Sequence, residues 1–128
     1  MPYQSYNPNP QGKRTGDCVV RAISKALNQD WEKTFLDLSI QAYAMADLIS
    51  SNSVWGVFLK NKGWSRELIP TECADCYTVE RFCEEHPKGT YLLAISGHLA
   101  CVEDGILYDA WNSLQEIPVY YWYKKEEE

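Results

Sequence analysis

The chain lacks the long apolar segments that would place it in a membrane. No stretch of its 128 residues approaches the roughly 18 consecutive apolar residues that a transmembrane helix needs. Residues 1–15 are polar and rich in Asn, Pro and Gln, so they do not resemble the apolar core of a signal peptide. We therefore expect no membrane partner.

Positive charge is also scarce, with 12 Lys and Arg against 18 Asp and Glu and a net charge of −6. Nucleic-acid binding depends largely on Lys and Arg that displace phosphate counterions, so we expect no nucleic-acid partner. The sequence has five cysteines, an odd number, which excludes a fully paired disulfide framework within one chain. The simplest compartment is a reducing cytoplasm, where a catalytic thiol stays usable.

The length and the 45% apolar content indicate one domain, 1–128, with a real hydrophobic core. Residues 1–15 read as an irregular segment and 124–128 as a frayed acidic tail. Apolar periodicity and capping residues predict helices near 18–28, after Asp30, after Ser53 and near 78–86. Extended segments are predicted at 64–69, 90–95, 98–103, 106–111 and 117–123. The fold class is therefore α+β, with N-terminal helices packed on a C-terminal antiparallel β-sheet.

Two local signals refine this arrangement. Asp104-Gly105 between two extended segments is typical of a two-residue β-hairpin turn. Pro118 cannot donate a backbone hydrogen bond, so it predicts that the last strand lies at a sheet edge or carries a bulge.

Cys18 is predicted in the first turn of a helix, with Asp17 as the N-cap. Free N–H groups and the helix dipole favour negative charge there, which lowers the pKa of a thiol and enriches the nucleophilic thiolate. The polar turn Thr15-Gly16-Asp17 exposes this helix start. The alternative for Cys18 is a small buried hydrophobic residue, as free cysteines usually are.

His98 opens an apolar strand, and the next strand returns across the Asp104-Gly105 turn. That pairing brings Asp109 near residue 100 or 101 and therefore close to His98. A carboxylate there can accept one imidazole N–H and leave the other ring nitrogen to face Cys18. Asn112 is the alternative orienter. The pattern predicts a cysteine nucleophile with its base and orienter.

Gln11-Gly12 followed by Gly16-Asp17-Cys18 resembles the nucleophile segment of papain-like cysteine peptidases. The family's usual interval from glutamine to cysteine is one residue shorter, and the second cysteine of the papain subgroup is missing. Asp109-Ala110-Trp111 resembles the family's Asn-Ser-Trp segment, with Asp in place of Asn.

The resemblance implies a papain-like fold and a Cys18-His98-Asp109 triad. It further implies that Gln11 contributes to the oxyanion hole with the Cys18 N–H, Asn9 being the alternative donor. Trp111 would shield the contact between the histidine and its orienter. The implied activity is that of a thiol hydrolase, a cysteine peptidase or amidase that forms an acyl-enzyme and needs no cofactor or metal. Its substrates would be peptides, isopeptides or other acyl compounds.

Two readings from other classes stay open. The first is a catalytically silent papain-like module that binds a partner protein through its cleft. The second is a zinc-binding interaction domain, because thiol and imidazole ligands can hold zinc tetrahedrally. Its ligands would be Cys73, Cys76, Cys83 and His86.

Overall fold

Helices and a sheet form separate layers in the computed structural model, which describes residues 2–69 and 77–124. In this part of the chain there are four helices: α1 Cys18–Leu27, α2 Trp31–Met45, α3 Asn52–Asn61 and α4 Val79–Glu85. The six strands are β1 Tyr3–Ser5, β2 Trp64–Leu68, β3 Thr90–Ile95, β4 His98–Glu103, β5 Ile106–Asp109 and β6 Pro118–Lys124. The α+β class is confirmed, and the predicted helices and strands lie within a few residues of their expected positions.

The sheet has the strand order β1-β5-β4-β3-β6-β2, and β1 runs parallel to β5 while the other pairs are antiparallel. The prediction of an irregular segment over residues 1–15 was wrong at Tyr3–Ser5, which form β1. The prediction of an antiparallel sheet was wrong for one pair, because β1 makes the sheet mixed. β1 forms by pairing with the outer edge of β5. The Leu107 N–H donates to the Pro2 carbonyl at 2.8 Å, and the Tyr6 N–H donates to the Asp109 carbonyl at 2.8 Å.

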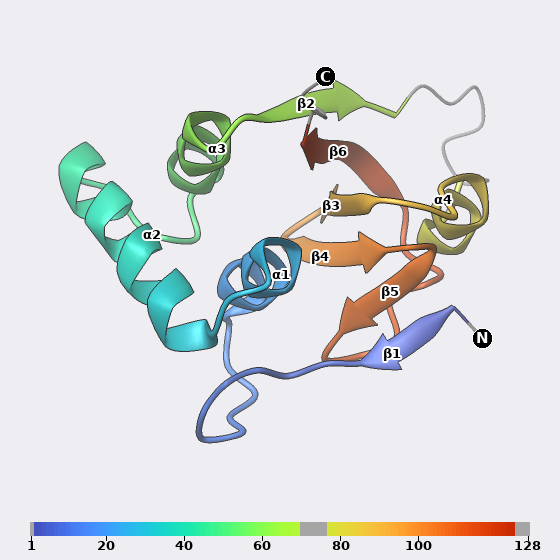
Figure 1. The fold of residues 1–128 in the computed structure, drawn as a ribbon, viewed down its shortest axis with the longest axis horizontal. Coiled ribbons are helices and arrows are strands. Elements are labelled where there is room, and N and C mark those ends of the chain that lie inside the picture. Colours follow the sequence, from blue (N-terminus) through green and yellow to red (C-terminus); the bar gives the residue numbers. More distant parts are fainter. Residues whose placement is uncertain (1, 70–76, 125–128) are drawn as a thin grey trace.

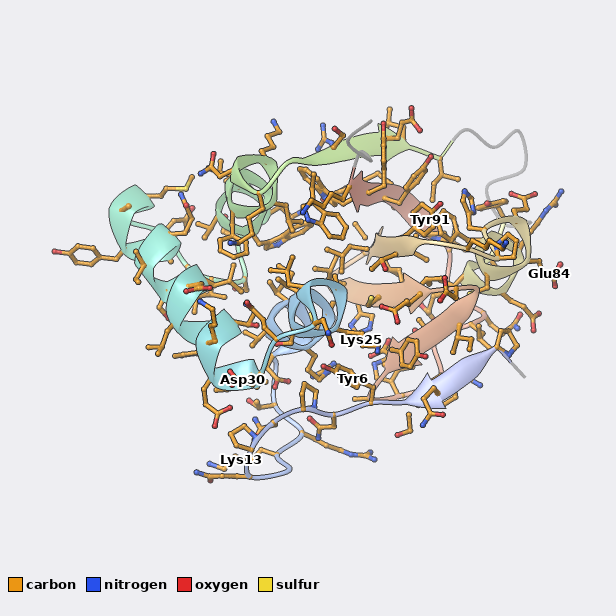
Figure 2. All side chains as sticks on the ribbon, in the orientation of Figure 1. Tyr6, Lys13, Lys25, Asp30, Glu84 and Tyr91 are labelled. Atoms are coloured by element: carbon orange, nitrogen blue, oxygen red, sulfur yellow. The ribbon has the colours of Figure 1, made fainter. Side chains whose placement is uncertain are left out.

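The sheet, drawn with the helices in Figure 1, separates two apolar clusters of buried side chains. On one face, α1 and α3 pack against the sheet through residues such as Ile23 and Trp55, and side chains fill this layer (Figure 2). On the other face, α4 contributes Val79 and Phe82. Side chains alternate along β3, so Leu92 belongs to the first cluster and its neighbour Leu93 to the second. The helix α2 packs on α1 and α3 and contributes Leu38 to the first cluster.

Local features shape two of the strands. β6 lies between β3 and β2 rather than at an edge, and the register shifts opposite Pro118, between Ala94 and Ile95, so the predicted alternative of a bulge is confirmed. That irregularity accommodates the missing N–H inside the sheet. β5 ends at Asp109, two positions early, because the Asp109 side chain accepts the Ala110 N–H at 2.8 Å and turns the chain.

The β4–β5 hairpin fixes the positions of two predicted site residues. Glu103 pairs with Ile106 across the two-residue turn, in which Asp104 has φ 51° and Gly105 φ 76°. Positive φ at both positions is what a type I′ turn requires. Continuing the register sets Asp109 opposite residue 100, so Asp109 and His98 lie on the same face as diagonal neighbours.

We predict that Gly105→Ala destabilises the protein more than Gly97→Ala. Both glycines have positive φ, at +76° and +68°, so each alanine costs about 1 kcal/mol of backbone strain. A Cβ on Gly105 would also lie 3.1 Å from the Cys83 carbonyl oxygen, whereas one on Gly97 would meet nothing within 4 Å. We expect this overpacking to cost at least about 1 kcal/mol more. Urea unfolding measures the difference, and equal losses would contradict the packing argument.

Candidate active site

Cys18, His98 and Asp109 come together from the ends of three elements: Cys18 begins α1, His98 begins β4 and Asp109 ends β5. The His98 Nε2–H donates to Asp109 Oδ2 at 2.7 Å. Cys18 and His98 line the same cavity, and Nδ1 is the ring nitrogen of His98 that Asp109 leaves free. The structure therefore brings together the three residues that the sequence pattern singles out.

The hydrogen bonds of this group shift two pKa values in a complementary way. Burial acts to raise the pKa of the Cys18 thiol, but hydrogen bonds from His98 and the Leu99 N–H, with the charges of His98 and Arg21, bring it below 9.0. Burial acts to lower the pKa of His98, but hydrogen bonds with Asp109 and Cys18 raise it to about 9. These directions favour a thiolate on Cys18 beside an imidazolium on His98.

The start of α1 adds to this preference for negative charge. Asp17 occupies the N-cap position, but its side chain does not cap the helix, contrary to the simplest expectation. One carboxylate oxygen is paired with Arg21, and the other accepts the Trp31 Nε1–H at 2.9 Å. The first N–H groups of α1 are therefore left without a side-chain acceptor, next to Cys18, which is only half-buried.

Asp109 is held by more partners than the sequence indicated. It is 2% exposed, and Oδ2 accepts the Ser113 hydroxyl at 2.7 Å in addition to His98. Its carbonyl oxygen accepts the Tyr6 N–H and the Tyr3 hydroxyl. Ser113 was not among the predicted site residues, although its proximity to Asp109 in the chain was an available signal. β1 was not predicted either, and it has no signal of its own.

Arg21 is a second site residue that the sequence pattern did not predict. It is buried on α1 between two carboxylates, paired with Asp17 through Nη1 and with Asp109 through Nη2 at 3.6 Å. The available signal was a cation four residues after Asp17, on the same helix face. Arg21 thus connects the helix of the nucleophile to the strand of the orienter.

Two further predicted residues, Trp111 and Asn112, differ in whether they contact His98. The Trp111 ring centroid lies 5.1 Å from that of His98, in a tilted arrangement, with Trp111 45% exposed, so it covers the imidazole from the solvent side. Asn112 is exposed, and its Oδ1 accepts the Leu114 N–H at 3.1 Å. The structure thus brings Asp109, rather than Asn112, to His98.

A cavity of about 440 Å³, which we call the Cys18 cavity, surrounds the thiol and is lined by Cys18, His98, Asn52, Trp55, Val119 and Tyr120 among others. Neither Gln11 nor Asn9 lines it. Gln11 is exposed, and its backbone N–H donates to Asn9 Oδ1 at 2.9 Å within a loop that folds on itself. The geometry therefore lends no support to an oxyanion role for either side chain.

The zinc alternative finds little support in the described residues. Cys73 and Cys76 lie outside them. Cys83 is buried in the α4 cluster, and the His86 ring stacks on Phe82 at a centroid distance of 3.8 Å. No group of three or more His, Cys, Asp or Glu side chains within 2–69 and 77–124 could hold a metal ion.

The chain was compared with protein families, curated proteins and solved structures. No protein-family model, curated protein or solved structure matches the chain. None of the helices in the described part of the chain is long and apolar enough to cross a bilayer.

We predict that Arg21→Met lowers the free energy of unfolding by about 3 kcal/mol, because it leaves Asp17 and Asp109 buried without their shared cation. Lys25→Met is the matched control on the same helix. Its ion pair with Glu103 is partly exposed, so we expect a loss of about 1 kcal/mol or less. Urea denaturation compares the two variants. Similar losses would contradict a bridging role for Arg21, and Arg21→Lys should recover part of the stability.

We predict that iodoacetamide alkylates Cys18 at lower pH than an ordinary cysteine, because the pKa of its thiol is lowered. The ion pair with His98 should persist as pH rises until His98, with a pKa of about 9, loses its proton. Cys83 should react only at higher pH, because burial and nearby glutamates raise the pKa of its thiol to about 11. Peptide mass spectrometry of the alkylated protein measures both rates.

The two histidines provide the control for this profile. His98→Ala should move the Cys18 profile to higher pH, because the stabilising hydrogen bond and charge are lost. His86→Ala should leave it unchanged, because His86 packs on α4. An unchanged Cys18 profile in His98→Ala would show that the two residues do not form an ion pair in solution.

Proposed function

We propose that the protein is a thiol hydrolase, a papain-like cysteine peptidase or amidase that works through an acyl-enzyme on Cys18. The observation that carries this proposal is the position of His98, which is hydrogen-bonded to the buried Asp109 carboxylate and lines one cavity with Cys18, whose thiol pKa it lowers. This is the arrangement in which a base activates a nucleophile and is itself oriented by a third group.

The reaction follows from these positions. The Cys18 thiolate attacks the carbonyl carbon of the substrate, and a sulfur–carbon bond forms. The His98 imidazolium then donates its proton to the leaving amine as the carbon–nitrogen bond breaks. In the second half, neutral His98 takes a proton from water, which attacks the thioester and releases the acid and Cys18. Asp109 keeps the imidazole in one tautomer throughout.

The backbone supplies the candidate oxyanion donors. The first N–H groups of α1, including that of Cys18, have no capping side chain, and a donor of this kind is worth about 3 kcal/mol in the transition state. Gln11 is not required for this role, because it does not line the Cys18 cavity.

The surroundings are compatible with an acyl substrate and a reducing compartment. The Cys18 cavity of about 440 Å³ falls within the range of ligand sites, so a peptide, isopeptide or other acyl compound can enter it. Cys18, Cys83 and Cys101 are free thiols, which supports a cytoplasmic location.

We predict that p-nitrophenyl acetate transfers its acetyl group to the Cys18 sulfur and releases p-nitrophenolate in a burst. His98→Ala should slow this acylation about 100-fold or more, because the thiolate loses its partner. In the Cys18→Ser variant, the acetylated peptide that contains residue 18 should disappear. Stopped-flow absorbance follows the burst, and mass spectrometry locates the acetyl group.

Cys83→Ser and His86→Ala are the matched controls, because both residues lie in or on the α4 cluster. They should leave the burst unchanged. A folded protein that shows no burst, or one whose acetyl group is found on another residue, would contradict the hydrolase proposal and favour the catalytically silent binding module.

A further inference from the structure

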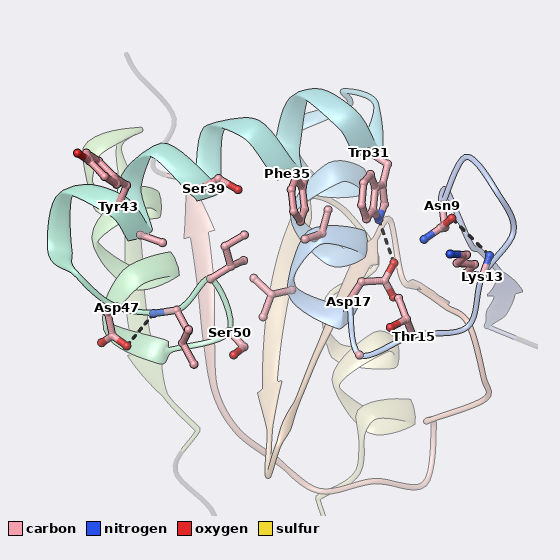
Figure 3. Close-up of a pocket in the computed structure, with 16 residues that line it drawn as sticks. Asn9, Lys13, Thr15, Asp17, Trp31, Phe35, Ser39, Tyr43, Asp47 and Ser50 are labelled. Atoms are coloured by element: carbon pink, nitrogen blue, oxygen red, sulfur yellow. Dashed lines mark hydrogen bonds between the residues drawn. The ribbon is translucent and has the colours of Figure 1, made fainter.

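A second cavity, of about 730 Å³, lies directly beside the Cys18 cavity. We call it the α2 groove, because α2 forms one wall, while the start of α1 and the loops before α1 and after α2 form the others (Figure 3). Gly16, Val19 and Ser50 line both cavities, and Val19 follows Cys18 in the chain. A substrate held at Cys18 can therefore extend into the α2 groove.

The lining of the α2 groove is mainly apolar. Trp31 and Phe35 stack with their ring centroids 5.0 Å apart, and both rings lie on the groove side of α2 (Figure 3). Val19 and Val20 contribute from α1. A cavity of this size with aromatic and aliphatic walls is suited to an apolar ligand.

The charged groups of the groove do not change this character. Both carboxylate oxygens of Asp17 are occupied, one by Arg21 and the other by Trp31. Asp47 accepts the Leu48 N–H at 2.7 Å, and Lys13 lies at the opposite end of the groove (Figure 3). The middle of the groove therefore offers apolar contacts rather than a charge partner.

Several large side chains of the groove face water. Phe35 is 39% exposed, Leu48 70% and Tyr43 90%. Covering these side chains with an apolar group would remove unfavourable hydration on both partners. The α2 groove adjoins the Cys18 cavity along Gly16, Val19 and Ser50, which points to a part of the substrate as its occupant.

We infer that the α2 groove binds a bulky apolar substituent of the substrate, close to the acyl group that Cys18 attacks. The inference rests on the proposed function for the identity of the nucleophile. The shared chemistry is a hydrocarbon group, which an aromatic peptide side chain or an alkyl chain can supply. α2 is then the element that determines specificity.

Three alkylating probes with the same reactive group test the inference: iodoacetamide, N-octyl-iodoacetamide and N-phenethyl-iodoacetamide. In each, the Cys18 sulfur bonds to the methylene carbon and iodide leaves. The rate at Cys18 is divided by the rate of the same probe with glutathione. We expect at least one apolar probe to exceed iodoacetamide about tenfold or more, which equals about 1.4 kcal/mol. A larger ratio for phenethyl supports a peptide side chain and a larger ratio for octyl an alkyl chain. Equal ratios for all three overturn the inference.

Two tryptophan substitutions on α2 locate the effect. Ser39 lines the α2 groove, so Ser39→Trp should fill it and remove the preference for apolar probes. Ile40 is the matched control, because it is 68% exposed and does not line the groove. Ile40→Trp should retain the preference. Retention of the preference in a folded Ser39→Trp variant overturns the inference.

A measurement on the unaltered protein makes the result independent of how the variants fold. An octyl probe with a terminal diazirine is attached to Cys18 and then photolysed. Crosslinks to Phe35, Ser39 or Tyr43 support the inference, whereas crosslinks to Trp55 or Tyr120 in the Cys18 cavity overturn it. Failure of the proposed function is distinguishable, because Cys18 would then react with plain iodoacetamide no faster than Cys83.

Discussion

The hydrogen bond between His98 and Asp109 is the contact on which the rest of the site depends. Its length is 2.7 Å, and it joins β4 to β5 at the open end of their hairpin. It assigns one ring nitrogen to the carboxylate and thereby leaves the other for Cys18. It is also the largest of the contributions that overcome burial and raise the pKa of His98. Because the strands are joined by a two-residue turn, the pairing of these side chains follows from register alone.

The buried charges around this contact have a positioning role rather than a stabilising one. Asp17, Arg21 and Asp109 are all buried, and transferring each charge from water costs several kcal/mol. Their attraction offsets that cost without exceeding it by much. These three side chains connect the first turn of α1 to the end of β5. The engagement of Asp17 by Arg21 and Trp31 also costs α1 its cap, worth about 1 kcal/mol. The uncapped N–H groups then favour the Cys18 thiolate.

The sequence predicts the site well where local signals end an element. Cys18 follows a polar turn, and the Asp104-Gly105 turn fixes the position of Asp109 through strand register. The sequence pattern is less informative where the position of a strand or side chain depends on contacts distant in sequence. The three residues of β1 are too few for a periodic pattern, and they become a strand only beside β5. Pro118 satisfies its local rule through a register shift rather than an edge. Gln11 comes one residue off the family spacing, and its N–H donates to Asn9 in a loop that does not line the Cys18 cavity.

In α2, too, local signals predict the element but not its long-range contacts. Its apolar residues at three- and four-residue intervals predict a helix, and the helix is present. Periodicity, however, reports which side chains share a face and not what covers them. The core accepts Leu38 and Ala42, whereas Phe35 remains partly in water and lines the α2 groove. Apolar surface that a chain keeps next to a nucleophile, rather than within its core, is available to a ligand. The apolar residues of α2 that folding leaves exposed are therefore the ones from which a function of this helix is best inferred.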